Sequence, residues 1–110
     1  MFYIYILYSL NSDLYYIGYT NDYTRRLIEH NKSPHHTFTS KHRPWVLKAV
    51  FSCGENESTA VQIERFIKKQ KSLQLIERLV EGGLLNQIEL ACLILYKFKK
   101  ALTWSAIKAF

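Results

Sequence analysis

Cysteine and acidic residues are both scarce in this sequence. The two cysteines, Cys53 and Cys92, form neither a disulfide framework nor the paired spacing of a zinc site. Such usage is typical of a reducing compartment, and we expect a cytoplasmic protein. Nine Asp and Glu stand against 15 Lys and Arg, which gives a net charge of +6. This excess indicates an anionic partner such as nucleic acid or a membrane surface, unless the charge serves solubility alone.

The chain also lacks a membrane-spanning run and the features of a leader peptide. Residues 2–8 are apolar but have no basic lead-in and no small-residue cleavage site, so we expect a strand there. The apolar run over residues 88–96 is too short and too interrupted to span a bilayer. We expect one domain over residues 1–83 and a helical extension over 84–110. The extension would pack on the domain, form a homodimer contact or lie on a membrane surface.

Two uncharged segments at the start of the chain are rich in β-branched and aromatic residues. They cover residues 2–8 and 14–20, and four turn-prone residues, 10–13, separate them. This pattern predicts a β-hairpin. Gly18 needs an explanation, because a glycine inside a strand usually marks a bulge or a close approach to the backbone.

The register of this hairpin places two tyrosines together. If the hairpin closes symmetrically about Asn11 and Ser12, paired residues have numbers that sum to 23, and Tyr5 lies opposite Gly18. Tyr16 then shares a face of the sheet with Tyr5. The hypothesis is a pair of phenols beside an open floor at the glycine. The alternative is a hydrophobic hairpin that uses tyrosine only as a strand-forming residue.

The remaining pattern predicts three helices and one further strand. Thr20 or Asn21 can cap the first helix, Ser58 the second and Ser72 the third. In chain order we expect a helix over 22–30, a loop over 31–44, a strand over 45–52 and helices over 58–70 and 73–80. With the hairpin, these elements predict an α+β domain. Its three-stranded antiparallel sheet, in strand order 2-1-3, would be flanked by helices.

Basic residues follow the hairpin closely. Arg26 and His30 lie four residues apart on the first expected helix, so they share one face. The loop after it contains no acidic residue, which suits a clamp on a nucleic-acid backbone or a plain solvated loop. Its Phe38 is able to stack on an exposed base. A metal site is disfavoured, because adjacent histidines rarely converge on one ion; its ligands would be His35, His36 and His42.

The second expected helix carries one acidic residue beside its apolar stripe. Ala60, Ile63 and Ile67 form the stripe, which should pack on the sheet. Glu64 lies next to the stripe, where it would either serve the site or form a surface ion pair with Lys68, one turn further along.

Tyr3-Ile4-Tyr5, a short hairpin and then Tyr16-Ile17-Gly18 resemble the two halves of the signature of the GIY-YIG nucleases. Tyr3 stands where the family most often has glycine. The resemblance covers residues 2–81 and looks most like the small stand-alone bacterial members. Arg26 stands at the position of the family's phosphate-binding arginine, His30 at that of its histidine and Glu64 at that of its metal-binding glutamate.

The resemblance implies an endonuclease that hydrolyses DNA with Mg²⁺ or Mn²⁺ held by Glu64. Arg26 would bind the phosphate, and Tyr5 or Tyr16 would take the proton from water once positive charge has lowered the pKa of that phenol. His30 would hold or relay a proton. Contacts with nucleic acid are expected from Gly18, Arg25, Lys32, Lys41, His42 and Arg43.

The substrate is expected to be DNA, with RNA left open, and to be selected by its shape rather than its sequence. A place in DNA repair or recombination would follow. Two alternatives remain. The altered first half of the signature leaves room for an inactive nucleic-acid-binding module. The apolar extension over 84–110 leaves room for an interaction protein.

Overall fold

The computed structural model of the chain describes residues 1–82. The extension expected over 84–110 and its homodimer contact therefore lie outside the described residues. Within residues 1–82, no helix combines the length and apolar character needed to cross a membrane. The elements in chain order are β1 Tyr3–Ser9, β2 Leu14–Thr20, α1 Tyr23–Lys32, the 3-10 helix η1 Thr39–His42, β3 Trp45–Ser52, α2 Glu57–Gln70 and α3 Leu73–Gly82.

The three strands form one antiparallel sheet in the order β2-β1-β3, so the α+β class and the strand order are confirmed. Tyr5 pairs with Gly18 in the hairpin, as the sum of 23 requires. At the turn, Asp13 adopts a left-handed conformation with φ of 53°. Its carboxylate accepts a 2.6 Å hydrogen bond from the Tyr8 hydroxyl, which ties the turn to the strand before it.

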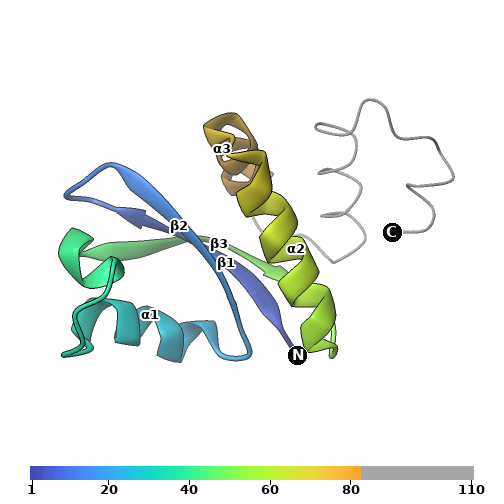
Figure 1. Ribbon diagram of the computed structural model, residues 1–110, viewed down its shortest axis with the longest axis horizontal. Coiled ribbons are helices and arrows are strands. Elements are labelled where there is room, and N and C mark those ends of the chain that lie inside the picture. The colour runs from blue at the N-terminus through green and yellow to red at the C-terminus, as the bar shows by residue number, and fades with distance from the viewer. Residues whose placement is uncertain (83–110) are drawn as a thin grey trace, which may run out of the picture.

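The helices cover the two faces of the sheet in separate layers (Figure 1). Ile4 and Ile6 of β1 point to one face, where they form the larger core with side chains of α2 and α3. Tyr5 and Leu7 point to the other face and pack with Trp45 and with side chains of α1. The predicted apolar stripe of α2 is confirmed, because its residues are all buried in the larger core; they are Ala60, Ile63 and Ile67.

A β-bulge in β3 changes which residues of this strand face each layer. Ile6 pairs with Ala49 but Leu7 pairs with Leu47, so exposed Lys48 is an extra residue. Such an insertion reverses the facing of every residue beyond it. Leu47 consequently packs on the α1 side, whereas Ala49 belongs to the larger core on the α2 side.

The start of α1 differs from the prediction. Asp22 is the N-cap, and its carboxylate accepts a 3.0 Å hydrogen bond from the backbone N–H of Arg25. The predicted caps, Thr20 and Asn21, are therefore wrong. Thr20 supports the cap instead, because its Oγ1 accepts a 3.1 Å hydrogen bond from the Asp22 backbone N–H.

The predicted cap of α2 is wrong, whereas the predicted cap of α3 is confirmed. Asn56, not Ser58, caps α2, since its Oδ1 accepts the 3.0 Å hydrogen bond of the Ser58 backbone N–H. Ser72 does cap α3, and its hydroxyl oxygen accepts a 3.1 Å hydrogen bond from the Leu75 backbone N–H. The single loop expected over 31–44 is also wrong, because α1 continues to Lys32 and η1 interrupts the rest.

Candidate active site

Two tyrosines and a histidine meet on the α1 face of the sheet. The ring centroids of Tyr5 and Tyr16 are 6.3 Å apart, which confirms that both phenols lie on one face. The His30 ring lies 4.8 Å from that of Tyr16. A 2.9 Å hydrogen bond joins the Tyr5 hydroxyl to His30 Nε2. Adjacent strands and one helix thus bring together residues from three separate parts of the chain.

Gly18 makes this arrangement possible in a way that the sequence did not predict. A Cβ atom on Gly18 would lie 2.6 Å from Cζ of Tyr5, far inside contact distance. The phenol ring therefore occupies the space above the glycine. The predicted open floor is wrong, and the missing side chain serves to admit the Tyr5 ring rather than a ligand.

His30 sits at the centre of a buried polar chain. It is 3% exposed, and its Nδ1 forms a 2.9 Å hydrogen bond with Oγ1 of Thr39. Burial and the neighbouring Arg26 charge lower the pKa of His30 to about 4. The imidazole is consequently neutral at pH 7, with one ring nitrogen donating and the other accepting.

Thr39 is a site residue that the sequence argument missed. It is buried, and its backbone carbonyl accepts a 2.8 Å hydrogen bond from the Trp45 indole N–H. This contact holds the threonine in place while its hydroxyl meets His30. No spacing in the sequence marks it, because η1 brings it to the histidine only in the folded chain.

The two phenols differ in their surroundings. Tyr5 is 2% exposed, and burial raises its pKa well above the ordinary value, with a smaller contribution from Tyr16. The Arg26 guanidinium acts in the opposite direction but does not outweigh burial. Arg26 alone thus does not bring the pKa of Tyr5 below its ordinary value, and the lowering of a phenol pKa by Arg26 and a bound metal together stays a prediction.

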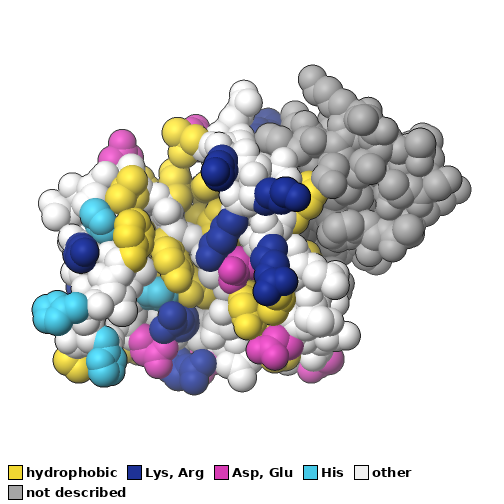
Figure 2. All heavy atoms as spheres, viewed as in Figure 1, with side chains coloured by type: hydrophobic (Ala, Val, Ile, Leu, Met, Phe, Trp, Pro, Cys, Tyr) yellow, Lys and Arg dark blue, Asp and Glu magenta, His cyan; other side chains and the backbone are white. Residues whose placement is uncertain are grey.

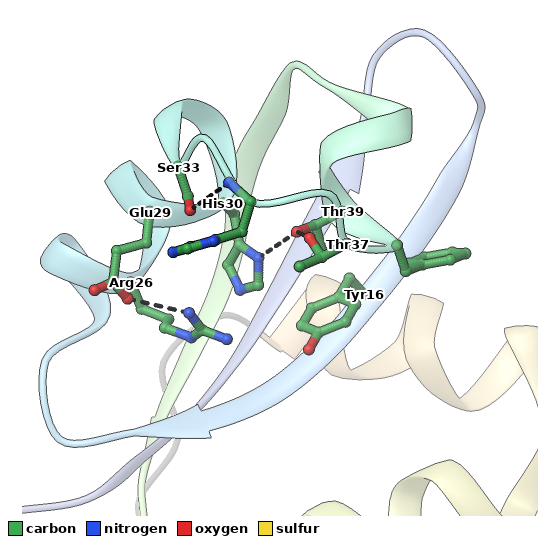
Figure 3. A pocket seen from close by; sticks show the side chains of 9 residues that line it. Tyr16, Arg26, Glu29, His30, Ser33, Thr37 and Thr39 are labelled. Carbon is green, nitrogen blue, oxygen red and sulfur yellow. Dashed lines mark hydrogen bonds and ion pairs between the residues drawn. The ribbon is translucent and has the colours of Figure 1, made fainter.

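A cleft of about 530 Å³ opens beside these residues. Arg26, His30 and Tyr16 point into it, the first two from α1 and the third from β2 (Figure 3). Arg26 Nη1 forms a 3.1 Å ion pair with Oε1 of Glu29, another lining residue that the sequence argument missed although it lies only three residues away. Further lining residues are Ser33, His35, Thr37, Phe38 and Thr39.

Glu64 lies beside this cleft rather than in it. Among the described residues, the cleft lining includes neither Glu64 nor Tyr5. Glu64 Oε1 forms a 3.0 Å ion pair with Lys68 Nζ, and that ammonium lies 5.7 Å from the Tyr16 ring centroid. Because α2 covers the opposite layer, this pair reaches Tyr16 past the outer strand β2. The Glu64 charge is still felt at Tyr5, where it favours the protonated phenol.

A protein-family model described as the GIY-YIG catalytic domain matches residues 1–76. This chain belongs to the GIY-YIG family. The match confirms the resemblance drawn from the two half-signatures, although Tyr3 replaces the usual first glycine. It places the chain in a nuclease family. Among curated proteins, no match to the chain was found.

The residues of this GIY-YIG domain suit one kind of metal site. Within residues 1–82, no three His, Cys, Asp or Glu side chains gather as a ligand set, so His35, His36 and His42 form no metal site together. A lone carboxylate suits Mg²⁺ or Mn²⁺, which retain several waters and also bind phosphate oxygens. Glu64 fits such an ion: its side chain is 17% exposed, and its carboxylate already holds a cation, the Lys68 ammonium.

The predicted nucleic-acid contacts of the GIY-YIG domain fall into two groups. Arg25, Lys32 and Lys41 are exposed, as a phosphate contact requires. Arg43 instead holds the end of α1, since its Nε donates a 2.6 Å hydrogen bond to the His30 carbonyl. His42 is half-buried, and its Nδ1 forms a 2.8 Å hydrogen bond with the Ser12 hydroxyl.

Proposed function

We propose that this GIY-YIG domain is a divalent-metal-dependent endonuclease that hydrolyses DNA phosphodiester bonds. The observation that carries the proposal is the convergence of Tyr16, Arg26 and His30 on one open cleft. Phosphodiester hydrolysis needs a positive group for the phosphate, a polar group for the water and an acceptor for its proton. The cleft offers a candidate for each.

Arg26 is the phosphate-binding residue of this proposal. A guanidinium is permanently charged and grips phosphate oxygens with two parallel hydrogen bonds. In the free protein it pairs with Glu29, and both side chains are well exposed. Exposed pairs of this kind are weak, about 0–1 kcal/mol, so a phosphate is able to replace the carboxylate.

Tyr16 is the phenol that meets the attacking water, because it lines the cleft whereas Tyr5 is buried. Tyr5 acts as a positioning residue. Its hydroxyl holds His30 Nε2 from one side while Thr39 holds Nδ1 from the other. A phosphate bound to Arg26 would partly cancel the charge that lowers the pKa of His30, which makes the imidazole a better proton acceptor.

Glu64 would hold the divalent cation, Mg²⁺ or Mn²⁺. Such an ion, when bound, polarises a phosphate oxygen and stabilises the departing 3′ oxygen. The chain's own contribution is one carboxylate beside the phenols.

The surface around the cleft suits a DNA backbone more than base edges. Arg25, Lys32 and Lys41 are exposed cations, and such side chains bind phosphates without reading sequence. We therefore propose that the substrate is chosen by its shape, as in branched DNA, with a place in repair or recombination in the cytoplasm. We also retain the proposal of a catalytic domain over 1–83 and an extension over 84–110 that contacts a second copy.

Nicking of supercoiled plasmid and cleavage of branched DNA test this function directly. With Mg²⁺ or Mn²⁺ we expect cleavage that EDTA stops. Arg26→Ala and Glu64→Gln should each lose about 100-fold or more in rate. Tyr16→Phe should lose activity at unchanged stability, whereas Tyr5→Phe should lose both, since it leaves His30 Nε2 unpaired. Thermal unfolding followed by circular dichroism provides the stability comparison.

Two results would contradict the proposal. DNA binding without cleavage under any of these metals would support the alternative of an inactive binding module, which the Tyr3 departure keeps open. Cleavage that survives Arg26→Ala and Glu64→Gln would show that the activity does not come from this cleft.

A further inference from the structure

The cation held by Glu64 in the free protein is a side chain of its own helix. Lys68 Nζ lies 3.0 Å from Glu64 Oε1, one turn along α2. The Lys68 side chain is 48% exposed, while that of Glu64 is only 17% exposed. Glu64 is therefore the more covered partner of the pair, and Lys68 is the partner with more open space around its side chain.

The ammonium also faces the proposed water-binding phenol. Lys68 Nζ lies 5.7 Å from the centroid of the Tyr16 ring. A monovalent cation thus lies near both Glu64 and Tyr16, where the proposed function requires a divalent one. Both cations would draw on the same carboxylate, and their mutual repulsion disfavours binding of both at once.

We propose that Lys68 is a built-in occupant of the metal position and competes with the divalent cation for Glu64. This inference rests on the proposed function. When the cation binds, the long Lys68 side chain swings from the carboxylate to the surrounding surface. Figure 2 shows Lys and Arg side chains gathered over α2, and the freed ammonium would remain within this basic surface. The other exposed Lys and Arg of α2 are Arg65 and Lys69.

Replacement of Lys68 by the divalent cation on Glu64 couples the binding of that cation to the binding of DNA. An ammonium released beside Tyr16 gains a new partner only if a DNA phosphate is present. The cation and the DNA therefore each strengthen binding of the other, and by linkage the factor is the same in both directions. Lys68 would keep the occupancy of Glu64 by the divalent cation low until DNA binds.

Mn²⁺ titration of the full chain tests the competition, with free Mn²⁺ measured by its electron paramagnetic resonance signal. Lys68→Met should bind Mn²⁺ about three- to tenfold more tightly than the wild type, because both the competitor and its repulsion are gone. Lys68→Arg, which keeps the charge, should not exceed the wild-type affinity. Lys69→Met is the matched control, since it removes one charge from the next, exposed position of α2 and should change the affinity less than twofold.

The coupling has a separate readout in DNA affinity. Fluorescence anisotropy of a labelled duplex, in the Tyr16→Phe background, measures how far saturating Mn²⁺ tightens DNA binding. We expect this factor to fall at least twofold when Lys68 becomes Met, and to remain unchanged for Lys69→Met.

The outcomes separate this inference from the proposed function. Equal Mn²⁺ affinity in Lys68→Met and Lys69→Met, with binding still lost in Glu64→Gln, would overturn the inference alone. Mn²⁺ binding that is unaffected by Glu64→Gln would overturn the proposed metal site and the inference with it. An unchanged Mn²⁺ effect on DNA affinity in Lys68→Met would overturn the coupling.

Discussion

A residue without a side chain is as important to this site as the residues that carry its polar groups. Gly18 bears no side chain, and the Tyr5 ring occupies the vacant volume. That position brings the phenol to His30, which in turn faces Tyr16. The glycine that ends the second half-signature is thus explained by its packing against Tyr5 of the first half.

Gly18→Ala tests this packing. The new methyl would collide with the Tyr5 ring, which has little space to move because it is buried. We expect a loss of about 1–3 kcal/mol in the free energy of unfolding and a loss of nuclease activity. Urea denaturation measures the first, and plasmid nicking the second. Wild-type stability in Gly18→Ala would contradict the observed fit between ring and glycine.

His30 makes stability depend on pH. Its pKa is about 4 in the folded chain, against an ordinary 6.5, so the unfolded chain binds the extra proton more readily between these values. The stability contribution is thus complete above pH 6.5 and is lost as the pH falls towards 4. Between pH 7 and 4.5 we expect the His30 contribution to fall by about 2 kcal/mol.

Urea denaturation of the wild type and of His30→Gln at both pH values isolates this contribution. The variant will be less stable at pH 7, but its stability should fall less steeply with pH. His36→Asn changes an exposed histidine between α1 and η1, and it should keep the wild-type slope of stability against pH. Parallel slopes for the wild type and His30→Gln would show that His30 is not held neutral.

At the scale of elements, α1 carries Arg26 and His30 and is fixed at both of its ends. Asp22 caps the start, and Arg43 donates hydrogen bonds to the carbonyls of His30 and Ser33 at the end. Helix ends leave carbonyls without partners, and a guanidinium from outside the helix satisfies two of them here. The same contact fixes the backbone of the residue that binds Tyr5.

Arg43→Met should therefore destabilise the fold by about 2 kcal/mol, since two charge-assisted hydrogen bonds are lost. The hydrogen-exchange rate of backbone amides should increase most in the last turn of α1. Lys41→Met is the control, because this exposed residue lies two positions earlier and its loss should cost under about 0.5 kcal/mol. Equal effects of the two variants would argue against a structural function for Arg43.

Local patterns predicted most elements, and non-local contacts account for the errors. The bounds of β2 and β3 and the hairpin register were right. The signals that predict them, the apolar pattern of each strand and the residues of the turn, lie close together in the sequence. The bulge at Lys48 was not predictable, since it depends on how β3 packs against two layers at once. Likewise, the sequence predicts one pocket for Glu64 and Tyr16 but not that Lys68 would pair with Glu64 beside the Tyr16 ring, outside the lining of the cleft.

At the scale of the whole molecule, the excess of positive charge should appear in the salt dependence of DNA binding. Each phosphate contact removed lowers the slope of log K against log salt by about 0.9. The combined change of Arg25, Lys32 and Lys41 to Ala should therefore lower the slope by up to about 3. Fluorescence anisotropy with a labelled duplex over a range of salt concentrations measures it.

Arg78→Ala gives the comparison for this series. Arg78 is also exposed, but it lies on α3, in the layer opposite α1. It should leave the slope within about 0.3 of the wild type. A slope that falls equally with either variant would indicate that DNA binding is spread over the molecule rather than directed to the cleft.

Because β1 is the central strand, a one-residue error in its pairing would affect both faces of the sheet. Neighbouring residues of this strand serve opposite layers: Ile4 and Ile6 fill the larger core, and Tyr5 lies in the smaller core on the α1 side. A misaligned chain shifted by one position would exchange them, burying a hydroxyl among aliphatic side chains and leaving His30 Nε2 without its partner. Such a molecule would still contain every polar group of the proposed site, yet would not assemble it, so intact protein and correctly aligned protein need not be the same population in a preparation.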